Sequence, residues 1–198
     1  MKLVILTQPR YFVEEDKILE ALFEEGMDDL HLYKPGESPI YAERLLSLLP
    51  EDYHRRITVH DHFYLKDEFK LGGIHLDDMA QEKPNGYKGK ISRTCTLSDD
   101  IRQAKKKCRY VFLHTSFQMW GNEQPDTKAL SLAARNGLID KYVYAYGGMT
   151  LDNAQMARDL GFGGVVIGND LWDRFNIHQE CDYKAIIAYF SKLRSMIE

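Results

Sequence analysis

Cysteine and long apolar runs are scarce in this sequence, and each shortage excludes a class of protein. The chain has 3 cysteines, widely spaced and without a C-x-x-C pair, so they form neither a disulfide framework nor a structural zinc site. The N-terminal apolar run after Lys2 is too short for a signal peptide or a membrane span. We therefore expect a reduced, cytoplasmic protein with buried thiols, and Cys95 as a nucleophile is the less favoured alternative.

Neither sign of charge dominates. The 26 basic and 30 acidic residues leave a net charge of −4 over 198 residues. Binding to nucleic acid or to an anionic membrane needs a broad basic surface, which this balance does not provide. The one basic run, Lys105 to Lys107, ends a predicted helix, where cations favour the negative end of the helix dipole. We expect a small-molecule partner, with no nucleic acid and no membrane.

Short β-branched runs alternate along the chain with segments of helical periodicity. Apolar residues at i, i+3 and i+4 predict helices around Ile18–Phe23, Tyr41–Leu49, Ile101–Cys108, Leu130–Ala134, Ala154–Leu160 and Tyr183–Ile197. Residues 63–69 predict a short helix, and residues 77–89 a loop without one. Ser98 or Asp99 is the expected cap of the helix at 101, and Thr150 opens the helix that follows it. The eight predicted strands are residues 3–7, 29–32, 57–60, 73–76, 90–94, 110–114, 141–145 and 164–167.

Eight strands with a crossover after nearly every one predict a parallel sheet. The sequence therefore predicts a single (β/α)₈ TIM barrel over residues 1–198, compact, with one or two reduced crossover helices. An open doubly wound sheet is the competing architecture. An open sheet that binds a dinucleotide carries G-x-G-x-x-G after its first strand, whereas Gln8-Pro9-Arg10 follows the first strand here.

Glycine-rich turns follow the last two predicted strands. In such barrels these two loops commonly bind phosphate, because glycine lets backbone N–H groups approach an anion and a helix N-terminus adds partial positive charge. Gly148 lies in the first turn, and Gly168 and Asn169 lie in the second. The alternative is that these glycines only form tight turns. Lys34, just after the second strand, is either a charge partner for the phosphate or an exposed loop charge.

Five of the seven histidines fall at or just beyond the C-terminal ends of predicted strands: His31, His60, His62, His75 and His114. Histidine titrates near neutrality, so a group of them at one barrel mouth suits acid–base catalysis or metal binding. Hydrogen bonding to a loop is the structural alternative for each one. His54 and His178 lie in helix or loop context, where we expect surface positions.

The chain resembles the thiamine-phosphate synthase and thiazole tautomerase (TenI-like) superfamily. The resemblance runs in order through nearly the whole chain, at residues 30–36, 59–62, 73–76, 92–94, 110–113, 146–150 and 163–167. It implies a thiazole-phosphate cradle on Gly148, Gly168 and Asn169, with Thr94 in a matching element, and a magnesium ligand at Asp61. It also suggests a homodimer.

The residues that would clamp a leaving diphosphate depart from the family pattern. Tyr33 stands where the family has arginine, and His60 where it has asparagine. Residues 77–80 lack the family's second carboxylate position, and residues 117–120 lack its lysine. The histidine of the tautomerase relatives aligns with Thr115, one position after His114.

These observations predict a thiamine-biosynthesis barrel that binds thiazole phosphate. It resembles thiamine-phosphate synthase, with a TenI-like tautomerase or altered activity favoured by the missing clamp. His31, His114 and His60 are the acid–base candidates, and Asp61 is the candidate Mg²⁺ ligand. Two alternatives stay open: a non-catalytic sensor of a phosphate ligand, and a metal-dependent hydrolase that uses His60, His62, His114 and Asp61.

Overall fold

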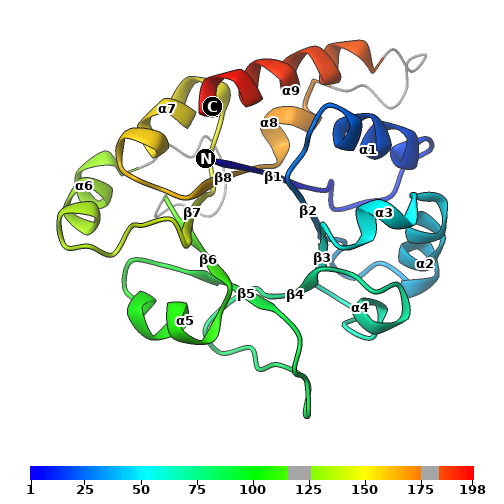
Figure 1. The fold of residues 1–198 in the computed structure, drawn as a ribbon, viewed down its shortest axis with the longest axis horizontal. Coiled ribbons are helices and arrows are strands. Elements are labelled where there is room, and N and C mark those ends of the chain that lie inside the picture. The colour runs from blue at the N-terminus through cyan, green and yellow to red at the C-terminus, as the bar shows by residue number, and fades with distance from the viewer. Residues whose placement is uncertain (116–125, 175–182) are drawn as a thin grey trace.

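A closed barrel of eight parallel strands forms the centre of the protein, as the sequence predicts (Figure 1). The computed structural model describes residues 1–115, 126–174 and 183–198. Each strand pairs with its neighbour in the chain, and β8 closes on β1 through pairs such as Val4 with Val166. The strands are β1 Lys2–Leu6, β2 Asp29–Leu32, β3 Ile57–Val59, β4 Gly73–Leu76, β5 Ile91–Cys95, β6 Tyr110–His114, β7 Val143–Tyr146 and β8 Gly164–Ile167.

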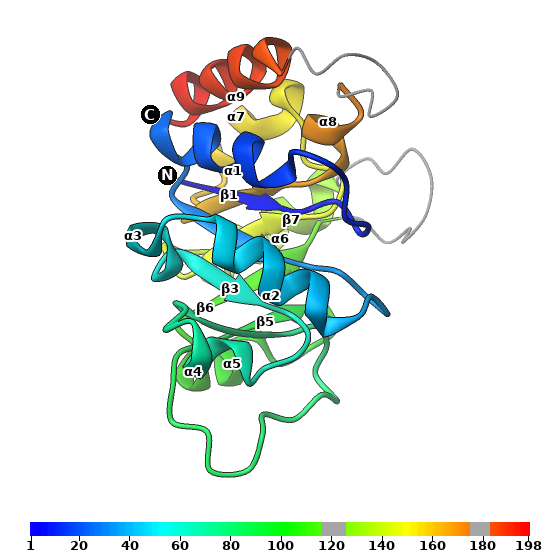
Figure 2. The same ribbon diagram turned by 90° about the vertical axis from the view of Figure 1, so that its right-hand side faces the viewer.

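Helices surround the barrel and pack on its outer face (Figure 1). β4 and β5 are joined without a helix, as predicted, by a segment that extends away from the barrel in Figure 2. The short helix expected at residues 63–69 is confirmed. The helices are α1 Glu15–Glu24, α2 Pro39–Leu48, α3 Glu51–His54, α4 Leu65–Glu68, α5 Ile101–Lys107, α6 Thr127–Arg135, α7 Leu151–Asp159, α8 Asn169–Trp172 and α9 Lys184–Ile197.

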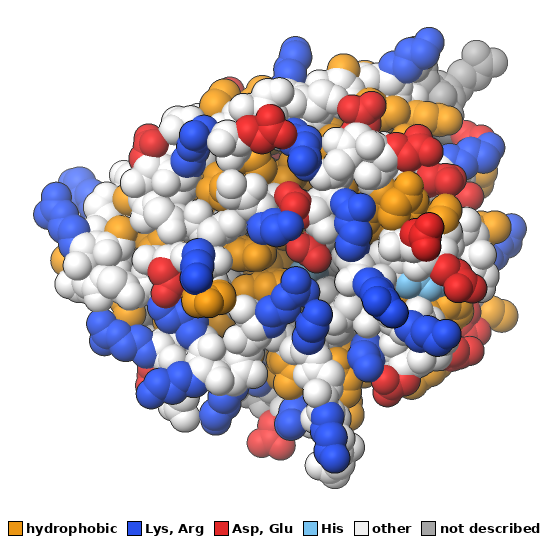
Figure 3. Space-filling model, in the orientation of Figure 1, with side chains coloured by type: hydrophobic (Ala, Val, Ile, Leu, Met, Phe, Trp, Pro, Cys, Tyr) orange, Lys and Arg blue, Asp and Glu red, His pale blue; other side chains and the backbone are white. Residues whose placement is uncertain are grey.

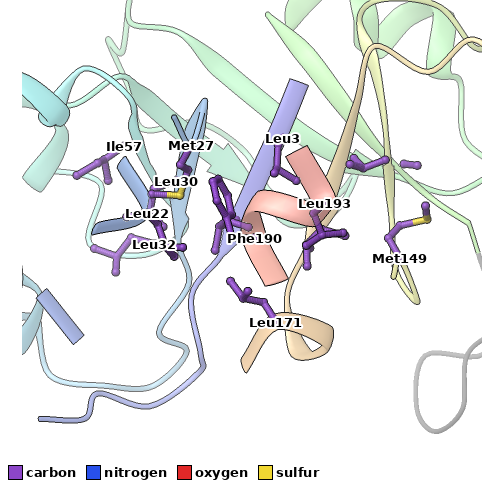
Figure 4. Close-up of a cluster of buried hydrophobic side chains, with 14 of the residues drawn as sticks. Leu3, Leu22, Met27, Leu30, Leu32, Ile57, Met149, Leu171, Phe190 and Leu193 are labelled. Carbon is purple, nitrogen blue, oxygen red and sulfur yellow. The ribbon is translucent and has the colours of Figure 1, made fainter. Parts of the chain in front are cut away.

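Side chains alternate between two faces of each strand, and this alternation separates two apolar regions. The larger region lies between the strands and the helices. There Phe190 of α9 packs in one cluster with Leu3 of β1 and Leu30 of β2 (Figure 4). The smaller region fills the barrel interior with a different set of residues: Val4, Leu6, Tyr110, Phe112, Tyr144 and Val166.

Three local expectations need correction. His54 is buried rather than on the surface, because its ring nitrogens lie 3.0 Å from the carbonyls of Phe69 and Leu46, at the ends of α4 and α2. The last carbonyls of a helix lack partners within it, and this imidazole supplies a donor. Asp100, not Ser98 or Asp99, caps α5 by accepting from the Gln103 N–H. His178 lies outside the described residues.

Other local expectations are confirmed. Asn153 accepts a hydrogen bond from the Thr150 backbone N–H at 2.8 Å, which closes the start of α7. Cys95 is buried, and burial raises the pKa of its thiol to about 12, which disfavours the thiolate that a nucleophile needs. Cys108 is a half-buried free thiol, and Cys181 is outside the described residues.

The surface agrees with the balanced charge. On the face drawn in Figure 3, basic and acidic side chains are interspersed. In the part of the chain that the structure describes, no helix combines the length and apolar character needed to cross a bilayer.

Removal of the α9 anchor tests the outer core. Phe190 is fully buried, so Phe190→Ala removes its contacts and leaves a cavity; we expect a loss of ~3–5 kcal/mol in the free energy of unfolding. Met196, on the same helix and 37% exposed, is the matched control, and Met196→Ala should change the free energy by less than ~0.5 kcal/mol. Urea unfolding of the three proteins measures both values. Equal losses would mean that α9 does not anchor the core.

Candidate ligand site at the mouth of the barrel

Polar side chains occupy the inward-facing row at the C-terminal end of the barrel. His31 of β2 pairs in register with Thr58 of β3, and His75 of β4 with Ser92 of β5. All four side chains are buried, although a strand lined by apolar residues would cost less to bury. The sequence therefore places buried hydrogen-bonding groups inside the barrel, on strands β2 to β5.

His31, His60 and His75 form a buried group that we call the histidine cluster. One ring nitrogen from each lies within 4.8 Å of the other two. His31 Nδ1 is 2.8 Å from His60 Nε2, and the rings of His60 and His75 stack with centroids 4.2 Å apart. Burial, and next the neighbouring His60, lowers the pKa of His31 and His75 well below the usual range, so both rings are neutral at pH 7.

Every outward ring nitrogen of the histidine cluster has a partner. His60 Nδ1 lies 2.6 Å from the carboxylate of Asp77, and His31 Nε2 lies 2.7 Å from the hydroxyl of Tyr110. A continuous chain of hydrogen bonds therefore runs from Asp77, which is 44% exposed, to the buried Tyr110. Such a chain fixes the rings and can move a proton between the rim and the interior.

His75 is held in place by two hydroxyl groups of β5. Its Nδ1 lies 2.8 Å from Ser92 Oγ and its Nε2 lies 2.9 Å from Thr94 Oγ1. Thr94, a predicted phosphate ligand, therefore faces the histidine cluster, and its phosphate role stays a prediction.

The two glycine loops, residues 146–150 and 167–170, lie side by side because β7 and β8 are paired. Gly147 and Gly148 have φ values of +87° and +62°, which glycine adopts without strain. Gly168 precedes α8, and Asn169 is its first residue. Among the described residues, the backbone N–H groups of Gly148, Gly168 and Asn169 donate to no acceptor within the protein. These are the groups predicted to bind phosphate.

His114 shares the inward row of β6 with Tyr110 and Phe112. Its ring stands at 81° to that of Tyr146 with centroids 5.5 Å apart, and it borders Gly147, where an added Cβ would meet it at 2.8 Å. Thr115 instead donates to the Gly147 carbonyl. The imidazole ring of His114 therefore lies beside the first glycine loop, whereas Thr115 bonds to the backbone of that loop.

Lys34 is not an exposed loop charge. It is 3% exposed, and its ammonium lies 2.6 Å from Glu15 Oε1 and 3.0 Å from the Arg10 carbonyl. The Tyr11 ring covers it, with the centroid 4.3 Å from Nζ. Burial raises the pKa of Glu15 to about 7 and lowers that of Lys34. The ammonium is therefore already paired inside the protein, and its role as a phosphate partner stays a prediction.

Asp61 carries a buried carboxylate oxygen, Oδ2, that has no hydrogen-bond partner among the described residues. A buried anionic oxygen without a partner is costly, and a bound cation relieves that cost. Asp61 thus fits a Mg²⁺ ligand, because Mg²⁺ prefers carboxylate oxygens. His62 lies apart from the cluster, with Nε2 3.0 Å from the Glu37 carbonyl.

Of the predicted site residues, the structure places His31, His60 and Thr94 around His75. It places His114 beside the glycine loops. Sequence reasoning gave His75 no individual role and missed Asp77 and Tyr110 as the ends of the hydrogen-bond chain. One signal for Tyr110 was available, since it lies two and four residues before Phe112 and His114 on one face of a strand. The expected family lysine position at 117–120 is outside the described residues.

The closed barrel of eight parallel strands with helices between them defines a (β/α)₈ TIM-barrel protein, the class in which ligand sites lie over the C-terminal ends of the strands. The chain is similar to a solved structure described as thiamine phosphate pyrophosphorylase from Bacteroides thetaiotaomicron. The two share 43% identity over 99% of this chain and 97% of that one, with a TM-score of 0.90. The chain belongs to the thiamine-phosphate synthase and TenI superfamily.

More distant structures share the fold. A thiamine phosphate pyrophosphorylase from Pyrococcus furiosus has 16% identity over 99% of this chain and 95% of that one, with a TM-score of 0.74. A 3-hexulose-6-phosphate synthase from Salmonella typhimurium has 12% identity over 100% and 98%, with a TM-score of 0.67. No family model and no curated protein matches the sequence.

Removal of one partner tests the buried ion pair of Lys34 and Glu15. Glu15→Gln leaves the Lys34 ammonium buried without its counter-charge, so we expect a loss of ~3–5 kcal/mol in the free energy of unfolding. The double variant Glu15→Gln, Lys34→Met should recover most of that loss. Chemical denaturation at pH 8, above the pKa of about 7 that burial gives Glu15, measures both.

The ion pair of Arg194 and Glu198, in which Glu198 is 67% exposed, is the matched control. Glu198→Gln should leave the free energy of unfolding nearly unchanged, because water and salt screen an exposed pair. A double variant no more stable than Glu15→Gln alone would argue against an uncompensated buried charge.

Proposed function

We propose that this protein acts in thiamine biosynthesis on a thiazole phosphate bound at the two glycine loops. The observation that carries the proposal is the set of backbone N–H groups at Gly148, Gly168 and Asn169, which have no acceptor among the described residues. Backbone N–H groups without an acceptor favour the binding of a phosphate even where no lysine or arginine side chain contacts it. The 43% identity to a thiamine phosphate pyrophosphorylase supports the same ligand class.

For the reaction we propose a proton-transfer step of the tautomerase kind. It moves a proton from one position of the bound thiazole ring to another and needs no leaving group. His114, beside the glycine loop, is the acid–base residue that we place nearest the ligand. His60 exchanges protons through Asp77, and His31 acts as a positioning residue behind His60, because both of its ring nitrogens are already bonded.

Thiamine-phosphate synthase activity is the second candidate, and the name of the 43% identical relative favours it. A leaving diphosphate needs several cationic contacts, each worth ~3–4 kcal/mol in the transition state. Lys34 is paired with Glu15, and Tyr33 stands in place of the family's arginine. Mg²⁺, held by Asp61, would neutralise part of the phosphate charge when bound.

Gly168→Ala tests the phosphate cradle. An added Cβ meets only Leu6, at 3.8 Å and beyond, so the structure has space for the methyl group. The methyl group would crowd the N–H groups of the second loop, and we expect at least a ~10-fold loss of affinity for thiazole phosphate, equal to ~1.4 kcal/mol. Calorimetry measures the affinity, and thermal unfolding checks the fold. Unchanged affinity would place the ligand elsewhere.

Assays with separate substrates distinguish the two reactions. Incubation with thiazole phosphate in D₂O should give deuterium uptake, and His114→Gln should slow it by ~10²–10⁴-fold, as removal of an acid–base residue does. His62→Gln is the control and should retain the rate. Turnover of ~1 s⁻¹ or more with the pyrimidine diphosphate, thiazole phosphate and Mg²⁺ would establish the synthase instead. Binding without either reaction would favour a sensor.

A further inference from the structure

We propose that the histidine cluster is a binding site for a divalent transition-metal ion of the zinc class, held by one ring nitrogen each from His31, His60 and His75. This site is separate from Asp61, the candidate Mg²⁺ ligand, and it does not depend on which reaction the protein catalyses. It also differs from the hydrolase alternative drawn from the sequence, because His62 lies outside the cluster and bonds to the Glu37 carbonyl.

The spacing of the three nitrogens suits one ion. They lie within 4.8 Å of one another, and the closest pair, His31 Nδ1 and His60 Nε2, is 2.8 Å apart. A tetrahedral zinc ion with bonds of about 2.0–2.1 Å needs nitrogens roughly 3.3 Å apart. To reach this geometry the short pair must open by roughly 0.5 Å, the most distant nitrogens must approach by up to roughly 1.5 Å, and His75 must turn out of its stack on His60.

The partners of the outward nitrogens carry the proposal furthest. Histidines that bind metals almost always donate their other N–H to a carboxylate, a backbone carbonyl or water, which fixes the ring toward the ion, and a side-chain hydroxyl oxygen can accept in the same way. Here Asp77 lies 2.6 Å from His60 Nδ1, and Tyr110 lies 2.7 Å from His31 Nε2. Both ring nitrogens of His75 have hydroxyl partners, so either can turn to the ion while the other stays held.

Metal binding to the histidine cluster requires only that a proton move between groups of the protein, with no net gain or loss of protons. Asp77 accepts from His60 Nδ1, which leaves His60 Nε2 unprotonated and able to accept from His31 Nδ1. When an ion enters, the His31 proton moves from Nδ1 to Nε2 and is donated to the Tyr110 oxygen. The Tyr110 hydroxyl then donates to Thr58 or Ser92, both of which lie within its hydrogen-bonding reach. All three rings stay neutral, as metal ligands must be.

The donor set selects the class of ion. Three imidazoles favour zinc, cobalt, nickel or copper, whereas Mg²⁺ prefers oxygen ligands. The three side chains are at most 4% exposed, so the site is shielded from competing water. Three protein ligands leave one tetrahedral position for water or a ligand oxygen, the pattern of zinc sites that act on a substrate.

Titration of the metal-stripped full chain with Co²⁺ and with Zn²⁺ tests the proposal. We expect a single site, with the visible absorption of tetrahedral Co²⁺ and its displacement by Zn²⁺. His75→Gln should abolish that spectrum. Asp77→Asn removes only the carboxylate at the exposed end of the chain and should weaken binding by ~10–100-fold without unfolding the protein.

His62→Gln and Asp61→Asn are the matched controls, and both should bind Co²⁺ like the unmodified protein. Circular dichroism checks that each variant is folded. The proposal is overturned if no stoichiometric ion binds, if binding survives in folded His75→Gln, or if Asp77→Asn binds with unchanged affinity. Loss of thiazole-phosphate binding by Gly168→Ala is a separate result, so either idea can fail alone.

Discussion

The need of every buried imidazole nitrogen for a partner organises the functional end of this barrel. Strand alternation directs the side chains of His31, His60 and His75 inward, where water cannot solvate them. Each ring must therefore find donors and acceptors on neighbouring strands. Two hydrogen-bonded groups result. One runs from Asp77 through His60 and His31 to Tyr110 on β6, and the other joins His75 on β4 to Ser92 and Thr94 on β5. The stacked rings of His60 and His75 connect the two groups.

The barrel mouth divides into two halves of different chemistry. On the β7 and β8 side, glycine loops present backbone N–H groups, which suit an anion. On the β2 to β4 side, neutral imidazoles present lone pairs, which suit a cation or a proton. A ligand with a phosphate at one end and a reactive ring at the other would span both halves, with His114 between them. This division explains why the proposed phosphate site would not need a lysine.

The buried side chains of Lys34 and Glu15 are paired with each other. Lys34 and Glu15 are nearly inaccessible, and the pKa of each is shifted toward its neutral form, so burial outweighs mutual attraction for both. Tyr11 closes over the pair. Through this pair Lys34 connects α1 to the segment after β2, and its role as a phosphate partner stays a prediction.

The sequence by itself determined the barrel, because period-two runs and helical periodicity are local signals that survive without tertiary context. The observed strand ends differ from the predicted ones by one or two residues. At β7, the Asp140 side chain accepts from the Tyr142 N–H in a turn, and the strand begins only after that turn. The glycine loops also follow from local pattern, whereas the direction of the His114 ring, beside Tyr146 and Gly147, is known only from the structure. Only the tertiary structure decided that Lys34 is paired with Glu15, that His54 is buried, and that His60 connects His31 to Asp77. These are contacts between residues 8 to 29 positions apart, and no local periodicity specifies which side chains meet across a closed barrel.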